Sequence, residues 1–328
     1  MKNSASISVV IPTRNRLVSL NRILDSIARQ TLAPKEIIII DSSENPLQRK
    51  QLQTTFTTIQ ILHSTPSVCL QRNIGIEKSN SDYIFLCDDD IELSENYCEV
   101  LLGFLESNKG EIIASGLVLE NHTSNWTYSE KKPSTLGLIN AYIFGLSVGF
   151  DANVPKLNNG FFTKRIISHY KNKGNSIAKS GWPIITNFDG KVFQAPIYGL
   201  GASMIRNEAL KKIGFDETFY ANGIGDNYDL AIIINAPVNV IKEAEAFHHR
   251  EKTDRLQNEK AYYYRINALH YILLKHKRFT VRNLAYFFWS LLGKSIQFLL
   301  RANFKTVYYN LEVMLRILFN QPLYRNKN

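Results

Sequence analysis

Three consecutive aspartates, Asp88, Asp89 and Asp90, follow a short apolar run that begins at Tyr83. Carboxylates this close repel one another, so the segment favours a compensating cation. Hard oxygen ligands select Mg²⁺ or Mn²⁺, and both ions also bind phosphate groups. The triplet therefore predicts a metal site for a phosphorylated ligand. The alternative is a solvated acidic loop, which its position after a strand disfavours.

The segments before the triplet alternate between strand and helix patterns. Apolar, mostly β-branched runs predict strands at Ile7–Ile11, Glu36–Ile40, Ile59–Leu62 and Tyr83–Leu86. Helical spacing of apolar residues predicts helices at Leu17–Gln30 and Gln71–Glu77. Such alternation is typical of an α/β fold with a mostly parallel sheet, whose ligands lie at the carboxyl ends of the strands. We therefore expect three polar segments to meet at one site: Thr13–Arg16, Asp41–Glu44 and Asp88–Asp90.

Further elements are predicted in the second half of the chain. They are a helix at Leu101–Leu105, a strand at Ile112–Val118, a strand at Tyr198–Arg206, a helix at Asn207–Ile213 and a strand at Val238–Ile241. Residues 120–195 are weakly periodic and rich in aromatic residues, Gly and Asn, which predicts long loops or a cover over the site. From Tyr262 onward we predict helices, with interruptions near Arg278–Thr280 and Ala302–Thr306.

Four motifs occur in the order found in the family-2 GT-A glycosyltransferases, which this chain resembles over residues 6–255. They are Ser8–Arg16, Glu36–Ser43, Gln71–Gly75 and the Asp88–Asp90 triplet. The resemblance implies a Rossmann-like GT-A fold with a mostly parallel sheet flanked by helices. It also implies a nucleotide-diphosphate sugar donor, most simply a UDP-sugar, with Mn²⁺ or Mg²⁺ on its pyrophosphate and inversion at the anomeric carbon.

The resemblance also implies roles for single residues on the donor side. Pro12, Thr13 and Arg16 would border the nucleotide base, and Asp41 would contact uracil and ribose. Arg72 would lie near the pyrophosphate. Ordinary alternatives are a turn or cap residue for Asp41 and a surface helix arginine for Arg72.

Among the metal ligands that the resemblance implies, Asp90 is favoured, with Asp89 as the alternative and Asp88 turned toward the ribose. A late segment, Ala246–Arg250, resembles the part of the family that closes over the diphosphate. It supplies His249 as an additional ligand, and its alternative is a surface histidine pair without a role.

The general base of an inverting transfer is expected in the segment that begins with Gly214-Phe-Asp-Glu. The family usually has an acidic pair here, whereas this chain has Asp226 followed by Asn227. An amide cannot accept a proton at neutral pH, so Asp226 is the favoured base and Asp229 the alternative. If Asp226 only caps the following helix, the enzyme would be slow or inactive.

The positive charge is concentrated at the end of the chain. The net charge is +10, yet residues 260–328 hold twelve Lys or Arg and one acid, Glu312, so the remainder sums to −1. The apolar segment Asn283–Leu300 is interrupted by Lys294 and Gln297, and Val307–Phe319 has a similar character. We predict helices that lie on an anionic membrane rather than cross it. The alternative is a helical pair packed on the catalytic domain, and the sequence has no nucleic-acid-binding motif.

The predicted organisation is a GT-A domain over residues 1–255, with a nucleotide-sugar half (1–118) and an acceptor half (119–255), and a membrane-associating helical extension over 256–328. Three cysteines without a pairing pattern and a short apolar stretch at Ile7–Ile11 predict a cytoplasmic protein on the inner face of the membrane. The expected activity is transfer of a sugar to a saccharide or lipid-linked acceptor for a surface polysaccharide or glycolipid. The alternatives are a nucleotide-sugar-binding partner of another transferase and a sugar nucleotidyltransferase.

Overall fold

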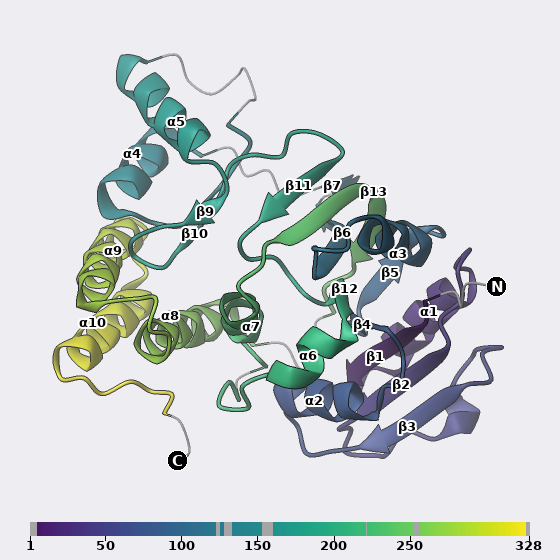
Figure 1. The fold of residues 1–328 in the computed structure, drawn as a ribbon. Coiled ribbons are helices and arrows are strands. Elements are labelled where there is room, and N and C mark those ends of the chain that lie inside the picture. The colour runs from purple at the N-terminus through teal and green to yellow at the C-terminus, as the bar shows by residue number, and fades with distance from the viewer. Residues whose placement is uncertain are drawn as a thin grey trace. The chain divides into compact units, whose positions relative to one another are not determined.

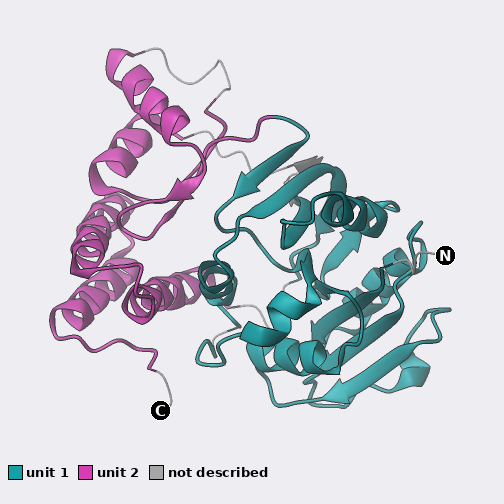
Figure 2. Cartoon of the chain, in the orientation of Figure 1, with its two compact units in different colours: residues 1–129, 190–255 teal, residues 130–189, 256–328 magenta. Residues whose placement is uncertain are grey.

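A computed structural model describes residues 5–122, 125–127, 133–152, 160–220, 222–251 and 256–325. The chain divides into two compact units (Figure 2). Unit 1 comprises residues 1–129 and 190–255, and unit 2 comprises residues 130–189 and 256–328. Each unit is therefore built from two separate stretches of the chain.

Unit 1 contains a large sheet and the helices that cover it (Figure 1). Its strands are β1 (Ile7–Thr13), β2 (Glu36–Asp41), β3 (Ile59–His63), β4 (Tyr83–Cys87), β5 (Ile91–Leu93), β6 (Ile113–His122), β7 (Asn125–Thr127), β11 (Val192–Ala195), β12 (Ala202–Arg206) and β13 (Val238–His248). Its helices are α1 (Leu17–Ala28), the short 3₁₀ helix η1 (Arg49–Gln51), α2 (Val68–Lys78), α3 (Tyr97–Ser107), α6 (Asn207–Ile213) and α7 (Asp226–Ile234).

The sheet has the strand order β11-β13-β6-β12-β4-β1-β2-β3. Strand β1 runs parallel to β2 and β4, and β2 runs parallel to β3. The next strand beyond β4 in the sheet, β12, is antiparallel to both of its neighbours, β4 and β6. Thr13 pairs with Asp41 at the carboxyl ends of β1 and β2. The polar segments after β1, β2 and β4 therefore meet at one edge, which confirms the predicted α/β arrangement.

The first strands are buried on both faces, which explains their continuous β-branched sequences. Val9 and Ile11 belong to a core that includes buried residues of α1 and α3. Val10 points to the other face, where α2 packs against β1 and β2. A methyl group on Gly75 of α2 would lie 2.3 Å from Val10 Cγ1. Gly75 is thus required by close packing between the helix and the sheet.

Strand β13 extends well beyond the predicted Val238–Ile241. Its pairing with β6 shifts register between Ile241 and Glu245, and the strand then continues to His248. The segment after the irregularity is polar and alternates, so a purely apolar strand pattern does not reveal it. This extension carries a histidine into the site described below.

Unit 2 contains helices and a small sheet. Its helices are α4 (Thr135–Phe144), α5 (Phe161–Lys173), α8 (Asn258–Lys275), α9 (Val281–Leu299) and α10 (Phe304–Leu318). The small sheet consists of β8 (Val148–Gly149), β9 (Ser176–Ile177) and β10 (Pro183–Ile185). The predicted interruption near Arg278–Thr280 is confirmed, because it lies between α8 and α9. The one near Ala302–Thr306 is confirmed in part: the helices are interrupted between Leu299 and Phe304, and the last three predicted residues belong to α10.

The prediction of long loops over residues 120–195 was wrong for α4 and α5. Helix α4 buries Leu138 and Ala141 but exposes Leu136 and Ile143, so its sequence is apolar on all sides and lacks an amphipathic period. It packs against α9 and α5. The structure accordingly groups residues 130–189 with the C-terminal helices rather than with the acceptor half. The boundary expected at residue 255 coincides with a boundary between the units.

Candidate active site

Arg72 connects two acidic segments that are far apart in the sequence. Its side chain on α2 is buried, and Nη2 donates to Asp88 Oδ1 at 2.8 Å, just beyond β4. Nη1 donates to Asp226 Oδ2 at 2.5 Å, at the start of α7. The guanidinium also lies over the ring of Phe215, 5.2 Å from its centroid. Arg72 is therefore not a surface arginine, and it brings the predicted base next to the predicted donor side.

The charges in this cluster affect one another's protonation. Burial by itself would lower the pKa of Arg72, but Asp226 and Asp88 outweigh it and raise that pKa, so Arg72 stays charged. Burial raises the pKa of Asp226 to about 6, against the opposing effect of Arg72. Asp226 is thus ionised at neutral pH and more basic than an ordinary aspartate.

Helix α7 begins at Asp226 without a side-chain cap. Asp226 Oδ1 accepts a hydrogen bond from the backbone N–H of Asn227, and its negative charge lies at the favourable end of the helix dipole. Asp229, in the same first turn, is almost completely buried. The Oδ1 of Asn227 accepts from Arg72 Nη1 at 3.4 Å. The structure therefore brings Asp226 and Asn227 to the same guanidinium.

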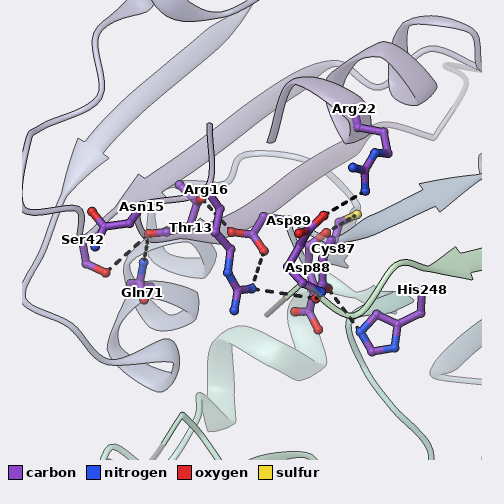
Figure 3. Close-up of polar contacts among 12 residues, drawn as sticks. Thr13, Asn15, Arg16, Arg22, Ser42, Gln71, Cys87, Asp88, Asp89 and His248 are labelled. Carbon is purple, nitrogen blue, oxygen red and sulfur yellow. Dashed lines mark hydrogen bonds and ion pairs between the residues drawn. The ribbon is translucent and has the colours of Figure 1, made fainter. Parts of the chain in front are cut away.

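The three aspartates of the triplet point to different partners. Asp88 turns to Arg72. Asp89 accepts from Thr13 Oγ1 at 2.8 Å and from Arg16 Nη1 at 3.0 Å (Figure 3). Burial raises the pKa of Asp89 to about 6, although Arg16 and Thr13 oppose the rise. Arg16 Nη1 also lies 3.8 Å from Asp90 Oδ2, so Asp89 and Asp90 share this guanidinium. Asp89 thus connects the loop after β4 to the loop after β1.

Asp90 lies beside a histidine that the sequence did not single out. Its Oδ1 is 3.3 Å from Nε2 of His248, at the end of β13. The predicted ligand His249 instead places its Nε2 2.9 Å from Glu92 Oε2. The geometry therefore favours His248 over His249 as the companion of Asp90. The pair His248-His249 was visible in the sequence, but only the register of β13 decides which ring faces the triplet.

Whether this arrangement fits a divalent cation depends on its donor atoms. Within the described ranges, no three His, Cys, Asp or Glu side chains are grouped as a metal site. Asp90 and His248 nevertheless bring a carboxylate oxygen and an imidazole nitrogen together, and Mn²⁺ accepts both donor types. Cations that bind phosphate substrates need few protein ligands, because phosphate oxygens and waters supply the others. The two side chains fit that kind of site.

The predicted nucleotide side of the site is ordered by contacts between the Asp41 side chain and the backbone. Asp41 is buried and accepts from the backbone N–H groups of Ser43 and Leu47, at 3.0 and 2.7 Å. Asp41 thus orders the loop after β2, and its contact with a base or ribose stays a prediction. Pro12 is buried within β1.

Gln71 is a structural residue of this site that sequence reasoning missed. Its Nε2 donates to the carbonyl oxygen of Thr13 at 3.0 Å (Figure 3). The same Nε2 donates to the carbonyl oxygen of Ile40 at 2.7 Å. These bonds fix the ends of β1 and β2 next to each other. The available signal was an amide on the sheet-facing side of α2, where an apolar residue is the usual choice.

Residues 8–214 match the profile of glycosyl transferase family 2. The protein belongs to this family. Among solved structures, it is similar to GalNAc-T7 crystallised with UDP, GalNAc and Mn²⁺, with a TM-score of 0.53 and 13% sequence identity. That alignment covers 82% of this glycosyltransferase and 48% of GalNAc-T7, and it supports the GT-A fold.

Known relatives align with limited parts of the glycosyltransferase. It is 37% identical over 103 residues to the uncharacterized glycosyltransferase YwdF of Bacillus subtilis, covering 31% of this chain and 38% of YwdF. It is 28% identical over 114 residues to the poly(ribitol-phosphate) beta-N-acetylglucosaminyltransferase TarP of Staphylococcus aureus, covering 33% and 35%. It is 29% identical over 126 residues to the putative colanic acid biosynthesis glycosyl transferase WcaA of Escherichia coli, covering 37% and 44%. The chain therefore matches less than half the length of these three relatives.

Proposed function

We propose that this glycosyltransferase moves a sugar from a nucleotide-diphosphate donor, a UDP-sugar by preference, to a saccharide or lipid-linked acceptor with inversion. The observation that supports this most is the bridge from Asp88 through Arg72 to Asp226. It connects the edge of the parallel sheet, where α/β folds bind ligands, to a buried carboxylate of suitable basicity. The names of TarP and WcaA support a role in surface polysaccharide biosynthesis.

Each side chain in the cluster has a distinct task in this proposal. Asp226 takes the proton from the acceptor hydroxyl as that oxygen attacks the anomeric carbon of the donor. Arg72 holds Asp226 in place and contributes positive charge near the diphosphate that leaves. Asp90 and His248 would hold a divalent cation, which when bound neutralises charge on the diphosphate. Asn227 orients the acceptor.

The test of this function is a search for the donor followed by product analysis. UDP-, GDP- and dTDP-sugars are compared for thermal stabilisation of the protein with and without Mn²⁺. The stabilising donor is then incubated with candidate acceptors, and the anomeric configuration of the product is read by NMR. Inverted product supports the proposal, whereas retained configuration contradicts it.

A second candidate function is a non-catalytic binding partner of another transferase, and Asn227 in place of an acidic residue favours it. Such a protein would bind UDP but would neither transfer nor hydrolyse the sugar. Measured turnover of the donor that stabilises the protein distinguishes the two functions. Turnover of the donor by the wild type excludes a purely non-catalytic binding function.

A substitution at Gly201 tests the donor side without replacing any polar residue. The Gly201 carbonyl oxygen accepts from the backbone N–H of Asp88 at 2.7 Å, and a methyl group on Gly201 would lie 2.0 Å from Asp88 Oδ2. Gly201→Ala should therefore push the Asp88 carboxylate away from Arg72. A charge-assisted hydrogen bond contributes about 1.5–3 kcal/mol, so we expect donor affinity to fall about 10- to 100-fold by calorimetry.

Gly199→Ala is the matched control, because a methyl group there would meet nothing within 4 Å. It should bind the donor like the wild type. If Gly201→Ala also binds the donor with wild-type affinity, the position of Asp88 does not matter for binding.

A further inference from the structure

Helix α10 exposes a row of large apolar side chains, although it also buries Val313 and Met314 on its inner face. Its outer face is a row of large apolar side chains, each between 49% and 69% exposed. The residues of this outer face are Phe304, Tyr308, Leu311, Leu315, Leu318 and Phe319. The five from Phe304 to Leu318 recur every three or four residues, the spacing of one helix face, and Phe319 is the C-cap residue, four positions after Leu315.

The inner face of α10 is partly polar. Asn310 is completely buried, and its Oδ1 accepts from Tyr262 of α8 at 2.6 Å. Its Nδ2 donates to Ser295 Oγ of α9 at 3.0 Å. Hydrogen bonds and the buried Val313 and Met314 thus join α10 to its neighbouring helices, while a second set of apolar side chains is exposed. A contiguous exposed apolar face of this kind marks a surface that contacts something other than water.

The outer face continues onto the turn that joins α9 and α10. Helices α9 and α10 lie side by side (Figure 1). At the turn, Leu299 and Leu300 are 50% and 84% exposed, next to Phe304. The exposed Arg301 occupies the same turn, and Lys305, in the first turn of α10, is exposed and ion-paired with Glu259 at 3.2 Å. Apolar and basic side chains are thus interleaved at one corner of unit 2.

The two units differ in net charge by more than residues 260–328 differ from the rest of the sequence. Unit 2 holds twenty Lys or Arg and five Asp or Glu, a net charge of +15. Unit 1 holds nineteen Lys or Arg and twenty-four Asp or Glu, a net charge of −5. A second copy bound through the outer face would bring two units of +15 together, which electrostatic repulsion disfavours. An anionic lipid surface is complementary to both the charge and the apolar side chains.

We propose that the outer face of α10, together with the α9–α10 turn, inserts into the surface of an anionic membrane. No helix within the described ranges is long and apolar enough to cross a bilayer. The helix would lie along the interface, with its Phe and Leu side chains among the acyl chains and its bases near the lipid phosphates. This inference does not depend on the proposed function, because it rests only on the side chains of unit 2.

The test is sedimentation with vesicles of phosphatidylglycerol and phosphatidylcholine, compared with vesicles of phosphatidylcholine alone, at physiological salt. The wild type should sediment with the anionic vesicles and much less with the neutral ones. The double variant Leu311→Asp/Leu315→Asp should bind at least about 10-fold more weakly, because it removes two inserted leucines and adds two negative charges. Both sites are exposed, so the fold should be retained, and circular dichroism checks this.

Val18→Asp is the matched control, because Val18 is 77% exposed but belongs to unit 1. It should sediment like the wild type. The proposal is overturned if the wild type does not bind anionic vesicles, or if the double variant binds as well as the wild type. It is also overturned if light scattering shows that the wild type is an oligomer and the double variant is a monomer. The outer face would then bind a second copy.

Discussion

Asp226→Asn is expected to lower kcat for sugar transfer about a hundred- to ten-thousand-fold, the usual cost of losing a general base. Donor affinity should stay close to that of the wild type, because Arg72 keeps its bond to Asp88. The variant leaves a buried guanidinium with one carboxylate fewer, so its melting temperature is measured alongside the rate. A rate near that of the wild type would show that the general base is Asp229 or another group.

Asn227→Asp is the companion experiment to Asp226→Asn. It introduces a carboxylate beside the same guanidinium, since Asn227 Oδ1 already accepts from Arg72. A higher rate would show that the acidic pair usual in the family is the better arrangement. A lower rate, with Asp226 intact, would show that the amide has its own function, such as orienting the acceptor.

The pH dependence should reflect the same base together with Asp89, because the pKa values of both are raised to about 6. The pKa of Asp226 is raised to about 6, so kcat/KM should fall as the pH is lowered through that value. The raised pKa means that the folded protein binds this proton more tightly than the unfolded chain. Protonation of Asp226 therefore adds stability as the pH falls from above 6 toward the unfolded value of 3.8. Activity lost between pH 7 and 5 should thus not coincide with a lower melting temperature caused by this group.

The sheet and its flanking helices could be predicted because their sequence patterns are local. Strands such as β2, with four consecutive isoleucines, are buried on both faces, and α1 has a regular apolar stripe. Helix α4 could not be predicted in this way, because its apolar residues surround the whole helix and only some of them are buried, where α4 packs against α5 and α9. The grouping of residues 130–189 with the C-terminal helices is a tertiary property that no local pattern contains.

The sequence predicted most of the residues of the candidate site, but not the contacts between them. The triplet, Arg72 and Asp226 were chosen from motifs, but no spacing predicts that Arg72 reaches across 154 residues to Asp226. The choice between His248 and His249 depended on the register shift in β13. A change of one residue in strand register turns a side chain to the opposite face, and the sequence around the shift does not fix that register.

Asp90→Asn should remove most of the Mn²⁺-dependent gain in UDP affinity while leaving the metal-independent part unchanged. The amide oxygen is a weaker ligand without charge, and losing even an outer partner of a metal site typically costs about 10- to 100-fold in affinity. His248→Asn should have an effect in the same direction, because its Nε2 lies 3.3 Å from Asp90.

His249→Asn is the matched control for these two variants, since His249 follows His248 in the chain but contacts Glu92. UDP affinity is measured by calorimetry with Mn²⁺ and with a chelator, and the ratio of the two values is compared among the variants. If Asp90→Asn keeps the wild-type ratio, the triplet does not hold the metal. If His249→Asn lowers the ratio and His248→Asn keeps the wild-type ratio, the ligand is His249 and the assignment of His248 is wrong.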